Sequence, residues 1–341
     1  MLLNLTTFSS EPIDAQILSQ ILERIVESDI LAGEELPSAG KLSRMQHIGK
    51  SAVIKAYREL ERIGAALPVK NGKFAVNKLS DEKLSEFADK IKKITKEESE
   101  KFNAELEAAR QIQKGLLPRV LPENDELSAA AYSTISKEVG GDFYDLYKME
   151  DGKYGILIGD ASGKGLPAAM LISQIQAIIK SDVSHRRSIN RTLSILNAYL
   201  KTFSSAKNFA TLFYGILDAA KGEMVYSNAG HNFPLLVKQN GEIKRLRTTG
   251  PALGLMRQIE YEEKTISIGK NETLFLFTDG LSETLNNNGE MFGEERIENI
   301  CLNNKENVPS EILDEVKREL KNFRSARYEN DDTTFMAVKR K

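Results

Sequence analysis

A stretch without glycine or proline divides the chain, from Asp81 to Lys114. It is crowded with lysine and glutamate, and its apolar residues follow one another three or four positions apart, as in a heptad repeat. The seam consists of Leu84, Phe87, Ile91 and Ile94, slips as in a stutter, and resumes with Phe102, Leu106, Ala109 and Ile112. A solvated single helix and a self-pairing coiled coil both fit. We favour the coiled coil because a second helix would cover the stripe, so we expect a helical linker over 79–115 and a homodimer.

Composition excludes several classes of protein. The 341 residues leave room for two or three domains, and a net charge of −2 gives no general attraction to nucleic acid or anionic membranes. Cys301 is the single cysteine and the three histidines are far apart, which argues against disulfide frameworks and zinc sites. The start lacks a signal-peptide pattern and no apolar run is long enough to span a membrane, so we expect a cytoplasmic protein.

The residues before the linker, 1–78, have the pattern of a winged helix-turn-helix. A helical apolar face runs from Ile13 to Ile30, and two shorter helices follow, the first capped by Ser38. We place the turn between them at 49–51. Asn71-Gly72 then marks the tip of a hairpin, because both residues tolerate a positive φ.

This unit resembles the winged-helix domain of the GntR-type regulators through "GEELPS", "AYREL" and "GKFAV". The resemblance implies DNA binding by a recognition helix in the major groove. Two positions depart from the family's pattern: Gly40 stands where an arginine is usual, and Gly49-Lys50 replaces Ser-Arg. Sensing of a protein or small effector, or dimerisation alone, therefore stays open beside DNA binding. The candidate DNA contacts are Ser38, Lys41, Lys50, Ser51 and Lys55.

Acidic residues stand at the ends of apolar strands in the remaining part of the chain. In "YGILIGDASGKG" a core strand ends in Asp160 among glycines, and Asp142 follows a glycine pair in "KEVGGDFYDLY". Asp279 ends the apolar run in "TLFLFTDGLSET", and Asp331 and Asp332 precede the last strand. One such acid is ordinary turn chemistry or a helix cap, but four on core strands indicate a shared site.

Converging carboxylates repel one another and need a cation. Oxygen ligands without cysteine or clustered histidine select hard ions such as Mg²⁺ or Mn²⁺. Two such ions about 4 Å apart would activate a water and polarise a phosphoryl oxygen. "SGKG" is not a phosphate-binding P-loop, because the first glycine of that motif is absent and Gly165 replaces its serine or threonine.

At these residues the chain resembles the metal-dependent PPM family of serine/threonine phosphatases, in its bacterial stage II sporulation and stress-response branch. The resemblance rests on the order and spacing of "AARQIQKGLLP", "GGDFYD", "GDASGKGLPAAM", "ATLFYGILD", "SNAGHNFPLLV", "GPALGL", "FTDGLSET" and "NDDTTFMAV". It implies an α/β sandwich over 116–341, in which two antiparallel sheets are flanked by helices. Alternation in 209–217 and 222–228 agrees with hairpin-linked strands.

The resemblance also implies the roles of individual residues. Asp160 would bridge two Mn²⁺ or Mg²⁺ ions, Asp142 and the carbonyl of Ala161 would complete one site, and Asp279 and Asp331 the other. Asp332 would support the site or bind a third ion. His231 in "NAGH" would shape a turn, with a general acid as the alternative, and Glu283 would be structural.

The implied reaction is hydrolysis of phosphoserine or phosphothreonine in a signalling pathway that works by partner switching. Its substrate would be a regulatory phosphoprotein of the anti-anti-sigma type. The alternative is a DNA-binding transcription regulator whose phosphatase-like domain is inactive and only binds a partner.

Overall fold

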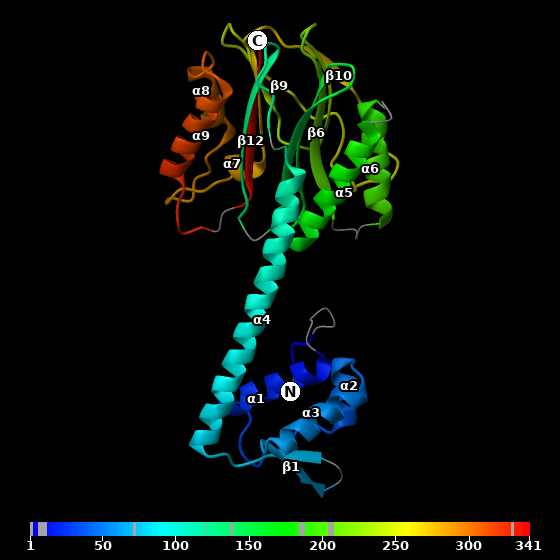
Figure 1. Ribbon diagram of the computed structural model, residues 1–341, viewed down its shortest axis with the longest axis vertical. Coiled ribbons are helices and arrows are strands. Elements are labelled where there is room, and N and C mark those ends of the chain that lie inside the picture. The colour runs from blue at the N-terminus through cyan, green and yellow to red at the C-terminus, as the bar shows by residue number, and fades with distance from the viewer. Residues whose placement is uncertain are drawn as a thin grey trace. The chain divides into compact units, whose positions relative to one another are not determined.

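The computed structural model describes residues 3–5, 12–70, 73–118, 120–136, 139–183, 188–203, 208–328 and 331–341. The chain divides into two compact units, Met1–Asn103 and Ala104–Lys341. We describe each unit by itself (Figure 1). Within the described residues, no helix is both long enough and apolar enough to cross a membrane.

Before residue 81, the described residues of the first unit form three helices and a two-stranded wing. The elements are α1 (Ile13–Val26), α2 (Ala39–Gln46), α3 (Lys50–Arg62), β1 (Ala66–Val69) and β2 (Lys73–Val76). Their core centres on fully buried Ile17, Ile21, Leu42 and Leu60, and β1 pairs with β2 in antiparallel register. This is the expected winged helix-turn-helix arrangement. The expected hairpin tip, Asn71-Gly72, lies outside the described residues.

The turn between α2 and α3 differs from our expectation. The sequence predicts a turn at 49–51, but α3 already begins at Lys50 and the turn consists of 47–49. His47 ends α2 because its backbone adopts the left-handed conformation, with φ of 53°. Positive φ is uncommon for residues other than glycine, so the residues around His47 do not mark the end of α2 in the sequence.

A single helix, α4 (Asp81–Leu116), follows the wing. Leu84 is half-buried and Phe87 is buried, and both pack against the hydrophobic core of the first unit. Phe102 and Ile112 are exposed, whereas the side chains of Ile91 and Ile94 lie outside the described set. The beginning of the stripe is thus covered within the chain itself, and the coiled coil stays a prediction for the rest.

The second unit is a sandwich of two antiparallel sheets with helices on both outer faces (Figure 1). One sheet has the order β10-β7-β6-β5-β4 and the other β3-β12-β11-β8-β9. The first sheet is built from β4 (Asp142–Lys148), β5 (Tyr154–Ala161), β6 (Ala210–Asp218), β7 (Glu223–Ala229) and β10 (Lys264–Ser267). The second is built from β3 (Leu127–Thr134), β8 (Leu235–Val237), β9 (Ile243–Arg245), β11 (Thr273–Phe277) and β12 (Thr333–Arg340).

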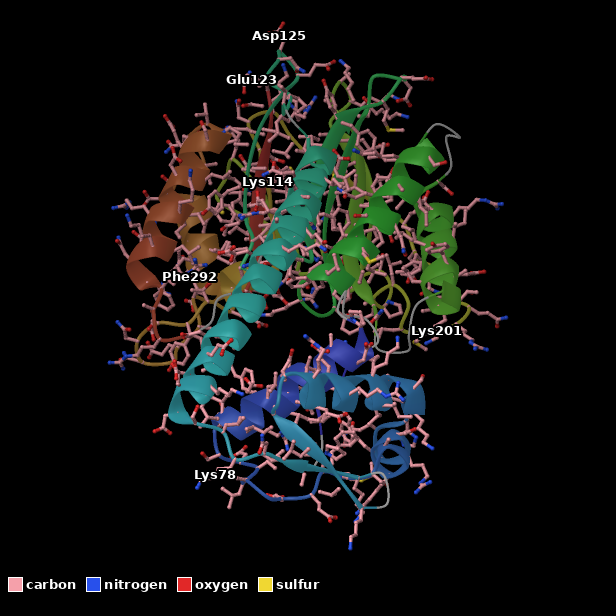
Figure 2. All side chains as sticks on the ribbon, turned by 60° about the horizontal axis from the view of Figure 1, so that its bottom comes forward. Lys78, Lys114, Glu123, Asp125, Lys201 and Phe292 are labelled. Atoms are coloured by element: carbon pink, nitrogen blue, oxygen red, sulfur yellow. The ribbon has the colours of Figure 1, made fainter. Side chains whose placement is uncertain are left out.

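Alternating side chains of these strands fill three apolar layers. The inner faces of both sheets form one core, with Ile156, Phe213 and Met336 among its members. Helices α5 (Leu166–Val183) and α6 (Ile189–Phe203) cover the first sheet, and α8 (Glu294–Asn303) and α9 (Pro309–Phe323) cover the second. Side chains occupy the layers between helices and sheets in Figure 2, where the labelled Phe292 belongs to the layer under α8 and α9. The predicted α/β sandwich is confirmed.

Candidate active site

Two of the predicted aspartates lie opposite each other on neighbouring strands. Asp142 is the first residue of β4 and Asp160 the last but one of β5, and the antiparallel register pairs them directly. Asp142 is buried, and its Oδ2 accepts a hydrogen bond of 2.8 Å from the hydroxyl of Thr278. Thr278 also accepts the main-chain N–H of Thr334 at 3.0 Å, so it ties Asp142 to the second sheet.

The other two aspartates come from the second sheet. Asp279 opens the short helix α7 (Asp279–Ser282) just after β11, and Asp331 lies two residues before the start of β12. Because β11 and β12 are paired neighbours, their adjoining ends bring these two carboxylates to one edge of the sheet. The field of Asp279, Asp331 and Asp332 also acts on Asp160, so the acidic ends of both sheets face one another.

Burial and mutual repulsion raise the pKa of these acids. The pKa of Asp160 rises to about 8, first because the carboxyl is desolvated and then because Asp279, Asp331 and Asp332 are close. The pKa of Asp142 lies well above its usual range for the same two reasons, with Asp160 as the main neighbour. That of Asp279 is raised by burial and by Glu283 and Asp331. A cation at this site would remove the repulsion.

A glycine keeps one part of the site open. A Cβ atom at Gly141 would lie 2.9 Å from the carbonyl oxygen of Ala161 and 3.1 Å from Oδ1 of Asp160. The carboxylate and the carbonyl predicted to bind the same metal thus border the same small space, which lacks a side chain only because residue 141 is glycine.

The donor set fits hard divalent ions, with one restriction. Among the described residues, no three histidine, cysteine, aspartate or glutamate side chains are placed so that they could hold one ion together. Magnesium commonly binds through one or two carboxylates and keeps several waters. Carboxylate pairs, together with the Ala161 carbonyl, meet that requirement and contain the residues predicted for both sites.

Both carboxylate oxygens of Asp332 accept hydrogen bonds from the chain that leads into β4. Its Oδ1 accepts hydrogen bonds from the N–H of Ser136 at 2.7 Å and from the Ser136 hydroxyl at 2.9 Å. Its Oδ2 accepts the N–H of Gly141 at 2.7 Å. Both oxygens are therefore engaged in holding the chain before Asp142, which fits the supporting alternative better than a third metal site.

Lys164 was missed as a site residue. Its Nζ lies 3.0 Å from Oδ2 of Asp331, and its charge also acts on Asp279. It is exposed, between Gly163 and Gly165, whose φ values of 92° and 75° need glycine. The signal for it is "SGKG", where a lysine stands between two glycines just after Asp160. This lysine places a positive charge beside the carboxylates.

His231 lies in the core, where burial lowers its pKa to about 4. The imidazole is therefore neutral at neutral pH. Its Nδ1 is 2.8 Å from the hydroxyl of Thr211, and the main-chain N–H of His231 donates to Oδ1 of Asn228 at 2.8 Å. These contacts fit the turn role rather than a protonated general acid. Cys301, also buried, lies in the layer under α8 and α9.

The candidate DNA contacts lie on α2, α3 and the residue that caps α2. Ser38 is the N-cap, and its hydroxyl accepts the N–H of Lys41 at 3.4 Å. Lys41, Lys50, Ser51 and Lys55 are exposed, whereas Val53 and Tyr57 on the same helix as Lys50 are buried. The predicted recognition helix therefore has a solvent-facing side that carries its cations.

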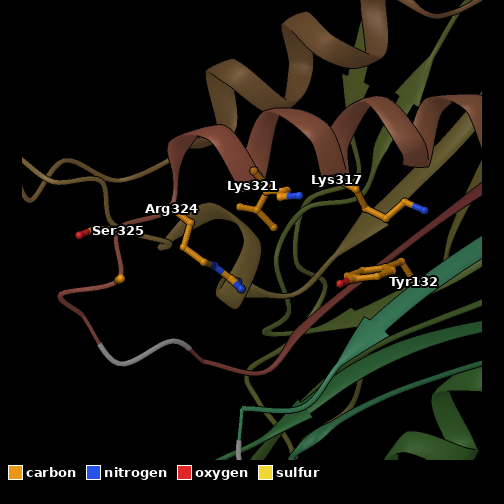
Figure 3. Close-up of a pocket in the computed structure, with 7 residues that line it drawn as sticks. Tyr132, Lys317, Lys321, Arg324 and Ser325 are labelled. Carbon is orange, nitrogen blue, oxygen red and sulfur yellow. The ribbon is translucent and has the colours of Figure 1, made fainter.

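A pocket of about 470 Å³ lies elsewhere, between α9 and β3 (Figure 3). Tyr132, Lys317, Lys321, Arg324 and Ser325 line it together with Leu320 and Ala326. It contains none of the predicted metal ligands. The acidic cluster, rather than this hollow, is therefore the candidate active site.

Comparison with known proteins agrees with this assignment of the fold. Protein IcfG of Synechocystis is 31% identical over 263 residues, which are 69% of this chain and 41% of that protein. Phosphoserine phosphatase RsbP of Bacillus subtilis is 24% identical over 238 residues, 69% of this chain and 57% of its own length. The chain thus spans about half the length of these two curated relatives. The solved SiaA-PP2C domain of Pseudomonas aeruginosa shares the fold, with a TM-score of 0.62 and 21% identity over 71% of this chain and 98% of that one.

The first unit has a separate relative. The uncharacterized HTH-type transcriptional regulator YhcF of Bacillus subtilis is 32% identical over 96 residues, 28% of this chain and 74% of that protein. The similarity is compatible with the winged helix-turn-helix arrangement of α1 to β2.

A family profile covers most of the second unit. The profile of stage II sporulation protein E (SpoIIE) matches residues 150–341, more than half of the chain and including Asp160, Asp279 and Asp331. This protein therefore belongs to the stage II sporulation protein E family.

Proposed function

We propose that this protein is a Mn²⁺- or Mg²⁺-dependent protein phosphatase that hydrolyses phosphoserine or phosphothreonine on a regulatory phosphoprotein of the anti-anti-sigma type. The observation that carries the proposal is the meeting of acidic strand ends from both sheets, with a raised pKa at Asp142, Asp160 and Asp279. Perturbed acids in one place are typical of active sites. The relative RsbP, named a phosphoserine phosphatase, supports the reaction class.

The residues divide the work as follows. Asp142, Asp160 and the Ala161 carbonyl would hold one ion, and Asp279 and Asp331 the other. Divalent ions bound there would supply positive charge for the phosphoryl oxygens and an activated water. Thr278 fixes the carboxylate of Asp142 by its 2.8 Å hydrogen bond. Lys164, beside Asp331, can donate to a phosphoryl oxygen of the substrate.

The test is hydrolysis of p-nitrophenyl phosphate by the full chain with Mn²⁺, with EDTA, and after Asp160→Asn. We expect turnover that needs the metal and that falls by about a hundredfold or more in the variant, because the site loses a ligand carboxylate. Asp151→Asn is the matched control, since Asp151 lies on an exposed turn and pairs with Lys153.

Turnover that survives EDTA, or that survives Asp160→Asn, would contradict the two-ion site. If the wild-type chain neither hydrolyses the ester nor binds Mn²⁺ in calorimetry, the alternative is favoured: a regulator whose phosphatase-like domain only binds a partner.

For the first unit we propose binding to duplex DNA through α3. The exposed Lys41, Lys50 and Lys55 support this role, because phosphate contacts by cations dominate the affinity for DNA. Lys50→Glu should weaken binding to a generic duplex by tenfold or so at low salt, as measured by fluorescence anisotropy. Unchanged affinity would mean that α3 does not contact DNA and would favour sensing or dimerisation.

We further propose that α4 carries a signal from the first unit to the active site. Its continuity from Asp81 to Leu116 supports this, since the helix belongs at one end to the first unit and at the other to the second. A rearrangement of dimer contacts along the seam would then turn or shift the end of α4 next to the strands of Asp142 and Asp160.

A further inference from the structure

The turn of Gly140 and Gly141, just before Asp142, has all four main-chain groups hydrogen-bonded. At Gly141, the N–H donates to Asp332 at 2.7 Å, and the carbonyl accepts the N–H of Ala161 at 3.0 Å. Ala161 is the last residue of β5, and Asp332 immediately precedes β12. At Gly140 the partner is different, and it comes from α4.

The side chain of Gln113 hydrogen-bonds to both the carbonyl and the N–H of Gly140. Its Nε2 donates to the Gly140 carbonyl at 2.7 Å, and its Oε1 accepts the Gly140 N–H at 3.1 Å. The Gln113 side chain is 7% exposed, so water competes little for these bonds. An amide is the side chain that can donate and accept in this reciprocal way.

Space around the turn makes its position exacting. A Cβ at Gly140 would lie 2.6 Å from Oδ2 of Asp332, and one at Gly141 would lie 2.9 Å from the Ala161 carbonyl oxygen. The turn is therefore enclosed by α4 on one side and by the ends of β5 and β12 on the other. A shift of the turn toward or away from α4 changes the separation of Asp142, Asp160 and Ala161.

We propose that Gln113 is a positioning residue for the active site: its amide holds Gly140, and thereby sets the distance between Asp142 and the Ala161–Asp160 edge. The inference rests on the proposed phosphatase function and names a contact through which α4 acts on it. A buried glutamine that merely satisfies a loop would contribute to stability and leave the geometry of the metal ligands unchanged.

The experiment replaces the amide without removing the packing volume, as Gln113→Met. Gln111→Met is the matched control, because Gln111 is exposed on the same helix and bonds only to Glu107 among the contacts described for its side chain. For p-nitrophenyl phosphate we expect at least a roughly tenfold lower kcat and a severalfold higher Mn²⁺ concentration at half-maximal rate for Gln113→Met. Thermal unfolding reports whether the variant folds.

A second readout needs no catalysis. In the metal-free full chain, hydrogen exchange at the Gly140 and Gly141 amides should accelerate by tenfold or more in Gln113→Met, with exchange in β5 and β12 unchanged. Gln113→Asn, one methylene shorter, should resemble the methionine variant, because its amide cannot span the same distance.

The proposal is overturned if Gln113→Met folds and keeps both kcat and the Mn²⁺ requirement within about twofold of wild type, or if glycine exchange is unaffected. It is also overturned if the variant loses only thermal stability. If wild type itself does not hydrolyse the ester, the phosphatase proposal fails, and the exchange measurement still decides whether Gln113 holds the turn.

Discussion

A single missing side chain keeps the candidate metal site open. Alanine at position 141 would place a Cβ against the Ala161 carbonyl and Asp160, and the first of these is backbone that cannot rotate away. We expect Gly141→Ala to cost about 1–3 kcal/mol in the free energy of unfolding. Turnover of the aryl phosphate should fall by more than the loss of folded protein accounts for, because the methyl group occupies the space beside two predicted ligands.

Gly115→Ala is the control for that substitution. A Cβ at Gly115 would meet nothing within 4 Å, and alanine favours a helix. Denaturant unfolding and steady-state kinetics of both variants are the measurements. Equal activity in Gly141→Ala and Gly115→Ala would mean that the space beside Asp160 does not need to stay open.

The acidic site residues could be predicted from sequence because each carries a local signal: Asp160 and Asp279 end apolar strands beside a glycine, and Asp142 and Asp331 stand at or before the start of a strand. Thr278 and Gln113 carry none. Thr278 bonds to Asp142, 136 positions away in the sequence, and Gln113 looks like one more polar residue of a linker helix. The partners of such residues depend on how the sheets and helices pack, which a local pattern does not contain.

At the scale of elements, α4 shows what a repeat pattern does not determine. The spacing of its apolar residues predicted a helix, but not which surface would cover each residue. Leu84 and Phe87 pack on the core of the first unit, whereas Phe102 and Ile112 are exposed. The apolar repeat of α4 therefore includes residues that are covered within the chain and residues that stay exposed and could contact a partner.

The coupling role of α4 can be tested by changing its phase. Two alanines inserted after Glu98 rotate the following helix by about 200° and lengthen it by about 3 Å. We expect the rate of aryl phosphate hydrolysis by the full chain to change severalfold, while a seven-residue insertion that preserves the heptad phase restores it. Identical rates in all three proteins would make α4 a tether.

At the scale of the whole molecule, the acidic cluster links stability to pH. Asp160 has a pKa of about 8 in the folded chain and an ordinary value of 3.8. The folded state therefore keeps a proton that the unfolded state has lost, and the stability due to this group falls as pH rises from about 4 to about 8. Asp142, whose pKa is also raised, acts in the same direction.

The measurement is the melting temperature of the full chain in EDTA at several pH values between 5 and 8. We expect it to fall with rising pH more steeply in wild type than in Asp160→Asn. Added Mn²⁺ should stabilise wild type more at pH 8 than at pH 5, because ion binding requires the ionised carboxylates. Parallel curves for the two proteins would contradict the raised pKa.

The layered fold could be predicted because apolar residues alternate along the strands and recur every three or four positions along the helices. Each pattern places the apolar side chains on one face, and that face packs on the core. The strand order could not. Strand β12 lies between β3 and β11, and its partner β3 precedes it by about two hundred residues, as in the pair Ala130–Ala337. No local pattern specifies a pairing over that separation.

The place of β12 has a consequence for biosynthesis. It is translated after every other strand of the two sheets, yet it occupies an inner position, and Asp331 and Asp332 stand at its beginning. A nascent chain in which all earlier strands have left the ribosome still lacks Asp331, a predicted metal ligand. It also lacks Asp332, whose carboxylate accepts the N–H of Gly141. We therefore expect a chain released before β12 is made to lack hydrolysis of the aryl phosphate, even though every other strand of the two sheets is present.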